Sequence, residues 1–204
     1  IIVDSNSAIS NAEVGAGSII TNTDIHGGWL ALNQASNVGI GQITVTNCRF
    51  FDWGWKAVTL ADVASGYLPP LITGCLLQNG LQSVTTPNGA RFGIQAGSGA
   101  HITDCDVHLL AAANGGVVGD VPLYLGSNDQ HWSNIRIDGG GITSPLVPGS
   151  GSYGAAPTGV VLDSILLTAG ATLSLQDMVS PTARDIVGTV TWGTGAGATS
   201  PARV

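Results

Sequence analysis

One arrangement of apolar and polar positions recurs along the chain. Segments of seven residues begin at Ile20, Val45, Ile72, Ile102 and Trp132, at intervals of 25, 27, 30 and 30 residues. Positions one, four and six of each segment are apolar or small, and positions two, five and seven are mostly polar. Alternation with a period of two is typical of a β-strand with one buried face. Each segment therefore predicts two short strands in line.

The third position of each segment interrupts this alternation. It carries residue types that tolerate a left-handed backbone better than others do. One such residue can bend a strand into the next without a loop. We therefore expect equivalent bends at Asn22, Asn47, Gly74, Asp104 and Asn134.

A second family of apolar strands precedes the bend segments, at residues 29–33, 57–61, 91–95, 122–126 and 159–163. A repeat of this length cannot bury its apolar face alone, whereas stacked repeats share one core. The sequence therefore predicts an all-β protein, a right-handed parallel β-helix of about five to six coils. We place it at residues 16–178, between an N-terminal lead-in segment (1–15) and a C-terminal cap or association segment (179–204).

Residues 162–168 (LDSILLT) fit two assignments. They match the bend segment weakly and the preceding strand family well. We expect the second assignment, with Gly170 as the bend and Thr172–Leu175 as the strand after it.

Composition and charge exclude several partners. The 204 residues are 44% hydrophobic and 9% charged, with a formal net charge of −7. Nucleic acids and anionic membranes select clustered Lys and Arg, so neither is an expected partner. No apolar run is long enough to span a bilayer, and we expect no membrane insertion. The chain opens at Ile1 and not at Met, which we interpret as a processed or excised piece of something longer.

The three cysteines, Cys48, Cys75 and Cys105, fall in the inward fourth column of the repeat. Their number and spacing fit neither a disulfide framework nor a zinc site. We expect them to be reduced, buried and stacked as small apolar residues. No metal and no cofactor is expected.

The recurring Ile-Thr-(Asn, Asp or Gly)-Cys pattern resembles the pectate-lyase-like superfamily of right-handed parallel β-helices, in which an Asn commonly makes a tight turn between sheets. Within that superfamily the chain is most similar to a bacteriophage tailspike or tail-fibre module. The resemblance implies a homotrimer, in a virion or outside the cell, that binds and often cleaves bacterial surface polysaccharide. The superfamily also holds lyases, hydrolases, epimerases and non-catalytic domains. A fragment of such an enzyme and a passive trimeric shaft therefore stay open, as does catalysis itself.

Two outward columns that follow the bend carry the candidate chemistry. If the repeats stack in register, acidic side chains lie beside Arg or His on neighbouring strands. This would form a sugar-binding or acid/base face, with Asp106, His108 and Asp138 as catalytic candidates and with Arg49 and Arg136 as binding candidates. The alternative is a ladder of ion pairs that only stabilises the sheet. The expected pairs are Asp24 with Arg49, Asp106 with Arg136, and His108 with Asp138.

The segment 51–56 gathers aromatic side chains at one corner. Trp53 and Trp55 beside Asp52, joined by Trp29, would suit carbohydrate, because a sugar stacks on indole while a carboxylate accepts its hydroxyls. Alternatively, these rings cap the corner or contact a neighbouring subunit. Glu13 is the only Glu and no Asp-Asp pair occurs, so a catalytic carboxylate pair would have to come from separate Asp residues.

Overall fold

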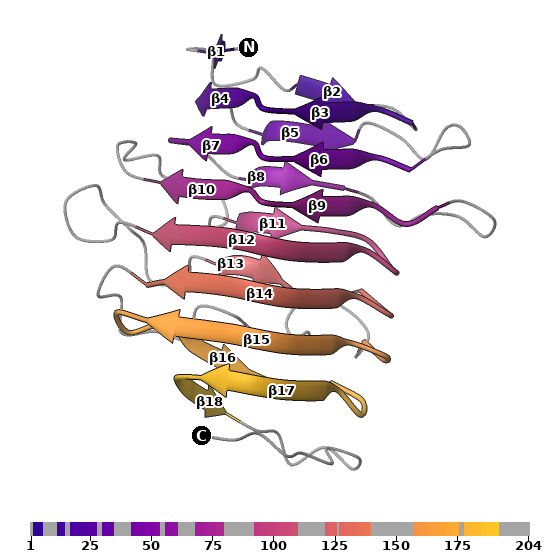
Figure 1. The fold of residues 1–204 in the computed structure, drawn as a ribbon, viewed down its shortest axis with the longest axis vertical. Coiled ribbons are helices and arrows are strands. Elements are labelled where there is room, and N and C mark those ends of the chain that lie inside the picture. Colours follow the sequence, from indigo (N-terminus) through magenta and orange to yellow (C-terminus); the bar gives the residue numbers. More distant parts are fainter. Residues whose placement is uncertain are drawn as a thin grey trace.

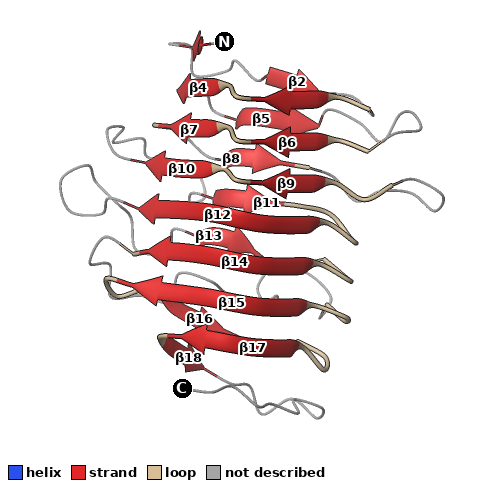
Figure 2. Cartoon of the chain, in the orientation of Figure 1, coloured by secondary structure: helices blue, strands red, loops and turns tan. Residues whose placement is uncertain are grey.

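The structure is a computed structural model, and the part of the chain that it describes is all-β (Figures 1 and 2). The described residues are 2–5, 12–14, 17–27, 30–34, 42–53, 56–60, 68–79, 92–109, 121–125, 127–139, 157–175 and 178–191. Within these ranges, every pairing between two strands is parallel. Such long parallel sheets are compatible with a β-helix.

The largest sheet has eleven strands, and the chain returns to it once in every repeat. Figure 1 shows its strands stacked as successive rows, with a five-stranded sheet behind them in this view. Eight strands of the large sheet pair in the order β1 (Ile2–Ser5), β4 (Asp24–Gly27), β7 (Arg49–Phe51), β10 (Leu76–Asn79), β12 (His101–Leu109), β14 (His131–Asp138), β15 (Val161–Thr168) and β17 (Thr182–Val187). Three more, β3 (Ile19–Thr21), β6 (Thr44–Thr46) and β9 (Leu71–Thr73), pair in a row that joins β12.

The strands that precede the bends form the second sheet. Its order is β13 (Val121–Tyr124), β11 (Phe92–Gln95), β8 (Lys56–Thr59), β5 (Leu30–Gln34) and β2 (Ala12–Val14). Four of the five predicted strands of this family are thereby confirmed. A two-stranded sheet, β16 (Thr172–Ser174) with β18 (Thr189–Thr191), lies near the C-terminal end of the described chain.

The five predicted bends are confirmed. All have a left-handed backbone, with φ of 52° at Asn22, 53° at Asn47, 64° at Gly74, 55° at Asp104 and 51° at Asn134. The backbone ladder continues through them, since the bend N–H donates to a threonine carbonyl of the following row, as from Asn47 to Thr73 (2.9 Å) and from Gly74 to Thr103 (3.1 Å). The residues on either side of each bend pair in register with those of the next row.

The assignment of residues 162–168 to the preceding strand family is wrong. Leu162 stands opposite Trp132 and Ile165 opposite Ile135, so β15 is another bend segment. Ser164, with φ of 56°, is its bend. Gly170 does have a left-handed backbone (φ 85°), but it lies in the turn between β15 and β16. The inward apolar residues of β15 determine its pairing register with β14, although Ser is a less usual bend residue than Asn.

Parallel pairing extends beyond the expected boundaries at residues 16 and 178. β1 and β2 pair with β4 and β5, so residues before 16 already belong to the stack. β17 pairs with β15, and Asp185 (φ 50°) occupies one more bend. Residues 192–204, part of the expected cap, lie outside the described residues.

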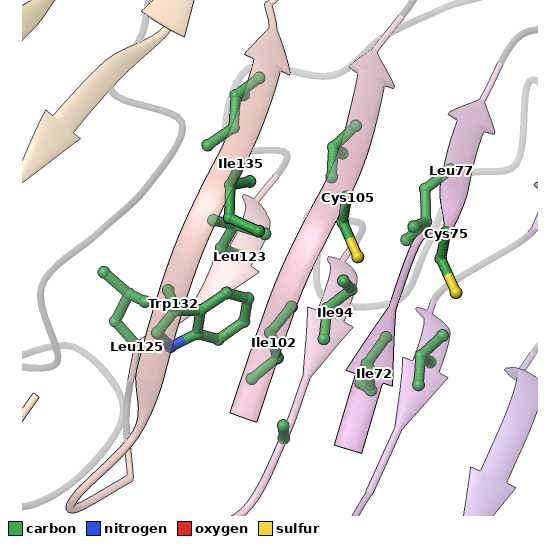
Figure 3. Packing of buried hydrophobic residues seen from close by; sticks show 14 of the residues in the cluster. Ile72, Cys75, Leu77, Ile94, Ile102, Cys105, Leu123, Leu125, Trp132 and Ile135 are labelled. Carbon is green, nitrogen blue, oxygen red and sulfur yellow. The ribbon is translucent and has the colours of Figure 1, made fainter. Parts of the chain in front are cut away.

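The inward columns of the two sheets meet in one apolar cluster (Figure 3). Trp132 and Ile94 are both fully buried there, from opposite sheets. The Trp132 indole N–H donates to the side-chain oxygen of Gln130 (3.2 Å), whose own NH₂ donates to the Ala96 carbonyl (2.5 Å). Each large side chain so buried contributes about 1.5–3 kcal/mol, and the pairing with Gln130 removes the cost of burying a polar N–H.

The cysteine stack is confirmed as buried and free of disulfides. Each thiol lies within hydrogen-bonding distance of the carbonyl two residues before it, at 3.4 Å for Cys48, 3.5 Å for Cys75 and 3.2 Å for Cys105. Hydrogen bonding to Cys75, together with burial, raises the pKa of Cys48. The hydrogen bond with Cys105 raises the pKa of Cys75 as well, and the same bond lowers the pKa of Cys105. Because all three thiols are buried, this column serves packing.

Candidate functional site

Outward side chains after the bends form two columns, which include the six rows from β4 to β15. We call this surface the post-bend face. The predicted neighbours Asp24 and Arg49, Asp106 and Arg136, and His108 and Asp138 all stand opposite one another in the strand register. The columns read Asp24, Arg49, Leu76, Asp106, Arg136, Leu166 and His26, Phe51, Gln78, His108, Asp138, Thr168.

Arg49 is held by Asp24 at the N-terminal end of the post-bend face. Its Nε donates to Asp24 Oδ1 at 2.7 Å, and its Nη2 donates to Asp24 Oδ2. The hydrogen bond from Arg49 lowers the pKa of Asp24. Because the guanidinium is largely exposed, such a pair adds little to stability. The ion-pair interpretation therefore fits this end of the face.

An aromatic stack lies beside this ion pair. The rings of His26 and Phe51 are 4.7 Å apart with 26° between their planes, and the Arg49 guanidinium carbon lies 5.9 Å from the centre of the Phe51 ring. Both rings are partly exposed. Sequence reasoning did not select Phe51, although its place in the seventh column marked it as outward.

Trp53 is wrong as a sugar-stacking residue. Its side chain is fully buried in the apolar cluster. The preceding residue, Asp52, has a left-handed backbone (φ 53°) and is partly buried, so the corner turns there and the next side chain points inward. The Trp53 indole N–H finds no partner among the described residues. Trp29 and Trp55 lie outside the described residues.

His108 and Asp138 face each other on neighbouring strands. Their Nδ1 and Oδ2 atoms are 4.0 Å apart, and about a quarter of each side chain is exposed (25% and 27%). This distance is too long for a direct hydrogen bond, but catalytic contacts often shorten when substrate binds. Gln78 stands on the other side of His108 in the same column.

A groove of about 320 Å³ crosses the bends of β12, β14 and β15. Two residues predicted from the sequence, Asp106 and Arg136, both line it. Sequence reasoning missed the contribution of the bend column, whose side chains point outward at the turn. The lining residues are Asp104, Cys105, Asp106, Asn134, Ile135, Arg136, Ser164 and Leu166.

The bend residues that line the groove hold one another. Asn134 Nδ2 donates to Asp104 Oδ1 at 2.6 Å, and Thr103 Oγ1 donates to Asp104 Oδ2 at 3.1 Å. Ser164 Oγ donates to Asp163 Oδ1 at 3.1 Å. These contacts fix the bend side chains in place, so this wall of the groove is organised before any ligand arrives.

Asp106 and Arg136 behave differently from the other acidic–basic pairs. Asp24 bonds Arg49, and Asp163 accepts from Arg184 Nη2 at 3.0 Å. In the part of the chain that the structure describes, no ion pair or hydrogen bond joins the side chains of Asp106 and Arg136, although their strands place them opposite each other. The expected ion pair is therefore not formed, and both groups line the groove with polar atoms available to a ligand.

Comparison with known proteins adds no further likeness: no protein-family model, curated protein or solved structure matches the chain. Two absences hold for the described residues. These residues contain no helix with the length and apolar character needed to cross a membrane. They also contain no group of three or more His, Cys, Asp or Glu side chains that could hold a metal ion.

Proposed function

We propose that this chain is a right-handed parallel β-helix of the pectate-lyase-like kind that recognises bacterial surface polysaccharide, as a phage tailspike module does. The observation that supports this most is the groove lined by Asp106 and Arg136, whose side chains form no ion pair or hydrogen bond with each other among the described residues. A carboxylate accepts hydrogen bonds from sugar hydroxyls, and a guanidinium donates to hydroxyl or carbonyl oxygens. The groove volume lies at the small end of the range for ligand sites, about 300–1,000 Å³.

The rigidity of the support favours a binding role. β12, β14 and β15 pair in register on both sides of their bends, from His101 opposite His131 to Asp138 opposite Thr168. Backbone groups fixed by two neighbouring strands do not have to be ordered when a ligand binds. Sites built on strands also hold their geometry better than sites on loops. A polysaccharide is long and only weakly hydrophobic, so it suits a face that is extended and polar.

Cleavage of the polysaccharide is the second candidate function, and the facing of His108 and Asp138 favours it. Asp106 lies two residues before His108 on the same strand, so three proton-transfer groups share the post-bend face. A lyase, hydrolase or epimerase needs an acid and a base placed on one bound sugar. In this proposal Asp106 is the acid or base that exchanges a proton with the bound sugar. His108 and Asp138 together supply the second proton-transfer group.

For the assembly, we propose a homotrimer located in a virion or outside the cell. Ile19 and Val187 are 74% and 60% exposed, and Leu68 is 59% exposed, so apolar side chains remain at the surface of one chain. Contacts between copies would cover such side chains. A passive trimeric shaft would share this assembly but would bind no glycan.

The test is a panel of capsular and O-antigen polysaccharides. Binding is measured for the parent chain, and cleavage is read from reducing ends and from the ultraviolet absorbance of unsaturated sugars. Arg136→Gln should weaken binding about tenfold or more, because a hydrogen bond to a charged group contributes about 1.5–3 kcal/mol. Arg184→Gln, which changes another exposed arginine outside the post-bend face, is the matched control and should bind as the parent does.

Asp106→Asn separates binding from catalysis. If the protein cleaves the glycan, this variant should keep binding and lose cleavage, since an amide cannot exchange the proton. Failure of the parent chain to bind any polysaccharide of the panel would contradict the proposed function. Equal losses from Arg136→Gln and Arg184→Gln would place the site away from the groove.

A further inference from the structure

Three side chains along one wall of the groove form an ordered set of chemical types. Asp106, Arg136 and Leu166 stand opposite one another on β12, β14 and β15, and all three line the groove. They present a hydrogen-bond acceptor, a donor and an apolar group in that order. We infer that the groove selects an uncharged sugar that carries an acetamido group, an inference that rests on the proposed function.

An acetamido group carries the complementary set of chemical types. Its N–H donates a hydrogen bond, its carbonyl oxygen accepts one, and its methyl group is apolar. The Asp106 carboxylate would accept from the N–H, the Arg136 guanidinium would donate to the carbonyl, and Leu166 would contact the methyl. In a trans amide the N–H and the carbonyl point to opposite sides. Asp106 would therefore accept from one side, and the long Arg136 side chain would reach the carbonyl from the other, over three strands that span about 10 Å.

Leu166 distinguishes this ligand from a sugar that has only hydroxyl groups. Its side chain is 38% exposed in the groove, and a hydroxyl placed against it would lose hydrogen bonds to water without gaining any. A methyl group in the same position buries apolar area on both partners. Leu166 is thus better suited to contact an acetyl methyl group than the hydroxyl groups of an unsubstituted sugar.

The charges around the groove and its apolar group together disfavour the two charged alternatives. Asp104 and Asp106 give two negative charges against one positive charge from Arg136, and the nearby Arg184 is held by Asp163. An acidic glycan would approach a groove with formal charge −1 on a chain of formal charge −7. A protonated amino sugar would be attracted by Asp104 and Asp106, but it would offer no methyl to Leu166 and would lose that apolar contact. An uncharged acetamido sugar meets neither penalty.

The experiment uses an array of bacterial capsular and O-antigen polysaccharides, sorted by whether they contain acetamido sugars. The tightest binder is then de-N-acetylated chemically, and part of it is re-N-acetylated. Binding is expected among the uncharged acetamido polysaccharides, with at least a tenfold loss after de-N-acetylation and recovery after re-N-acetylation. Equal binding of polysaccharides that lack the acetamido group would overturn this inference and leave the proposed function standing. No binding to any polysaccharide of the array would contradict both the proposed function and this inference.

A matched pair of variants tests the role of the apolar group. Leu166→Thr should weaken binding of the acetamido polysaccharide severalfold and leave the de-N-acetylated form unchanged. Val187→Thr changes the exposed residue that stands opposite Leu166 on β17 but does not line the groove, and should have no effect. Melting temperatures of both variants show whether each is folded. Equal binding by folded Leu166→Thr and the parent chain would contradict the assignment of the methyl contact.

Discussion

Gly74 offers the sharpest test of the bend ladder. It is the one glycine among the five predicted bends, with φ of 64°, and a Cβ added to it would lie 2.4 Å from Asn47 Oδ1 of the preceding row. For Gly74→Ala, the left-handed backbone costs roughly 1–2 kcal/mol. Turning the Asn47 side chain off its preferred rotamer costs a further 0.5–1.5 kcal/mol or so. We therefore expect the free energy of unfolding to fall by about 1.5–3.5 kcal/mol.

Urea denaturation monitored by circular dichroism measures this change through the midpoint and slope of the transition. Gly17→Ala is the matched control, because Gly17 has a similar φ of 77° and no atom within 4 Å of the added Cβ. It should lose only the backbone term, roughly 1–2 kcal/mol. In an Asn47→Gly background, Gly74→Ala should cost no more than this control. The same loss from Gly74→Ala in both backgrounds would refute the contact between neighbouring bends.

Three further predictions follow from the core, the face and the assembly. Cys75→Ala should lower the free energy of unfolding by about 1–2 kcal/mol through lost packing, and rapid labelling of the thiols in the native chain would show that they are not buried. Arg49→Gln should raise the pKa of Asp24 in a carbon-13 titration, because Arg49 lowers it in the parent chain. The stabilisation from that lowered pKa is present above the ordinary aspartate pKa and is lost as pH falls through the lowered one. An unchanged Asp24 titration in Arg49→Gln would contradict the ion pair. Light scattering should give a trimer at micromolar concentration, and a monomer would count against the proposed assembly.

The bends and the inward columns could be predicted because both are local properties of the sequence. Alternation identifies the buried face of a strand, and Asn47 or Asp104 in the middle of that alternation identifies the turn. Aligning the repeats then predicted which residues stand opposite one another on adjacent strands. Residues 162–168 were assigned wrongly because they fit the preceding strand family well and the bend pattern weakly. The inward residues Leu162 and Ile165 decide the pairing.

The candidate site was predicted less completely because it depends on contacts between repeats. The sequence placed Asp106 beside Arg136, but whether two such side chains bond each other is decided by their rotamers. Trp53 was assigned to the surface because aromatic residues near Asp suggest a sugar site, whereas the turn at Asp52 directs it into the core. Nothing in the alternation of the chain could show that the bends form one wall of a groove.

The central claim is that polysaccharide binds in the groove of the post-bend face. The most direct measurement is a crystal structure of the chain with an oligosaccharide fragment of the polysaccharide that it binds. We predict sugar oxygen or nitrogen atoms within about 3.2 Å of the Asp106 carboxylate and the Arg136 guanidinium. A fragment seated on the five-stranded sheet, with Asp106 and Arg136 still in contact with solvent alone, would contradict it.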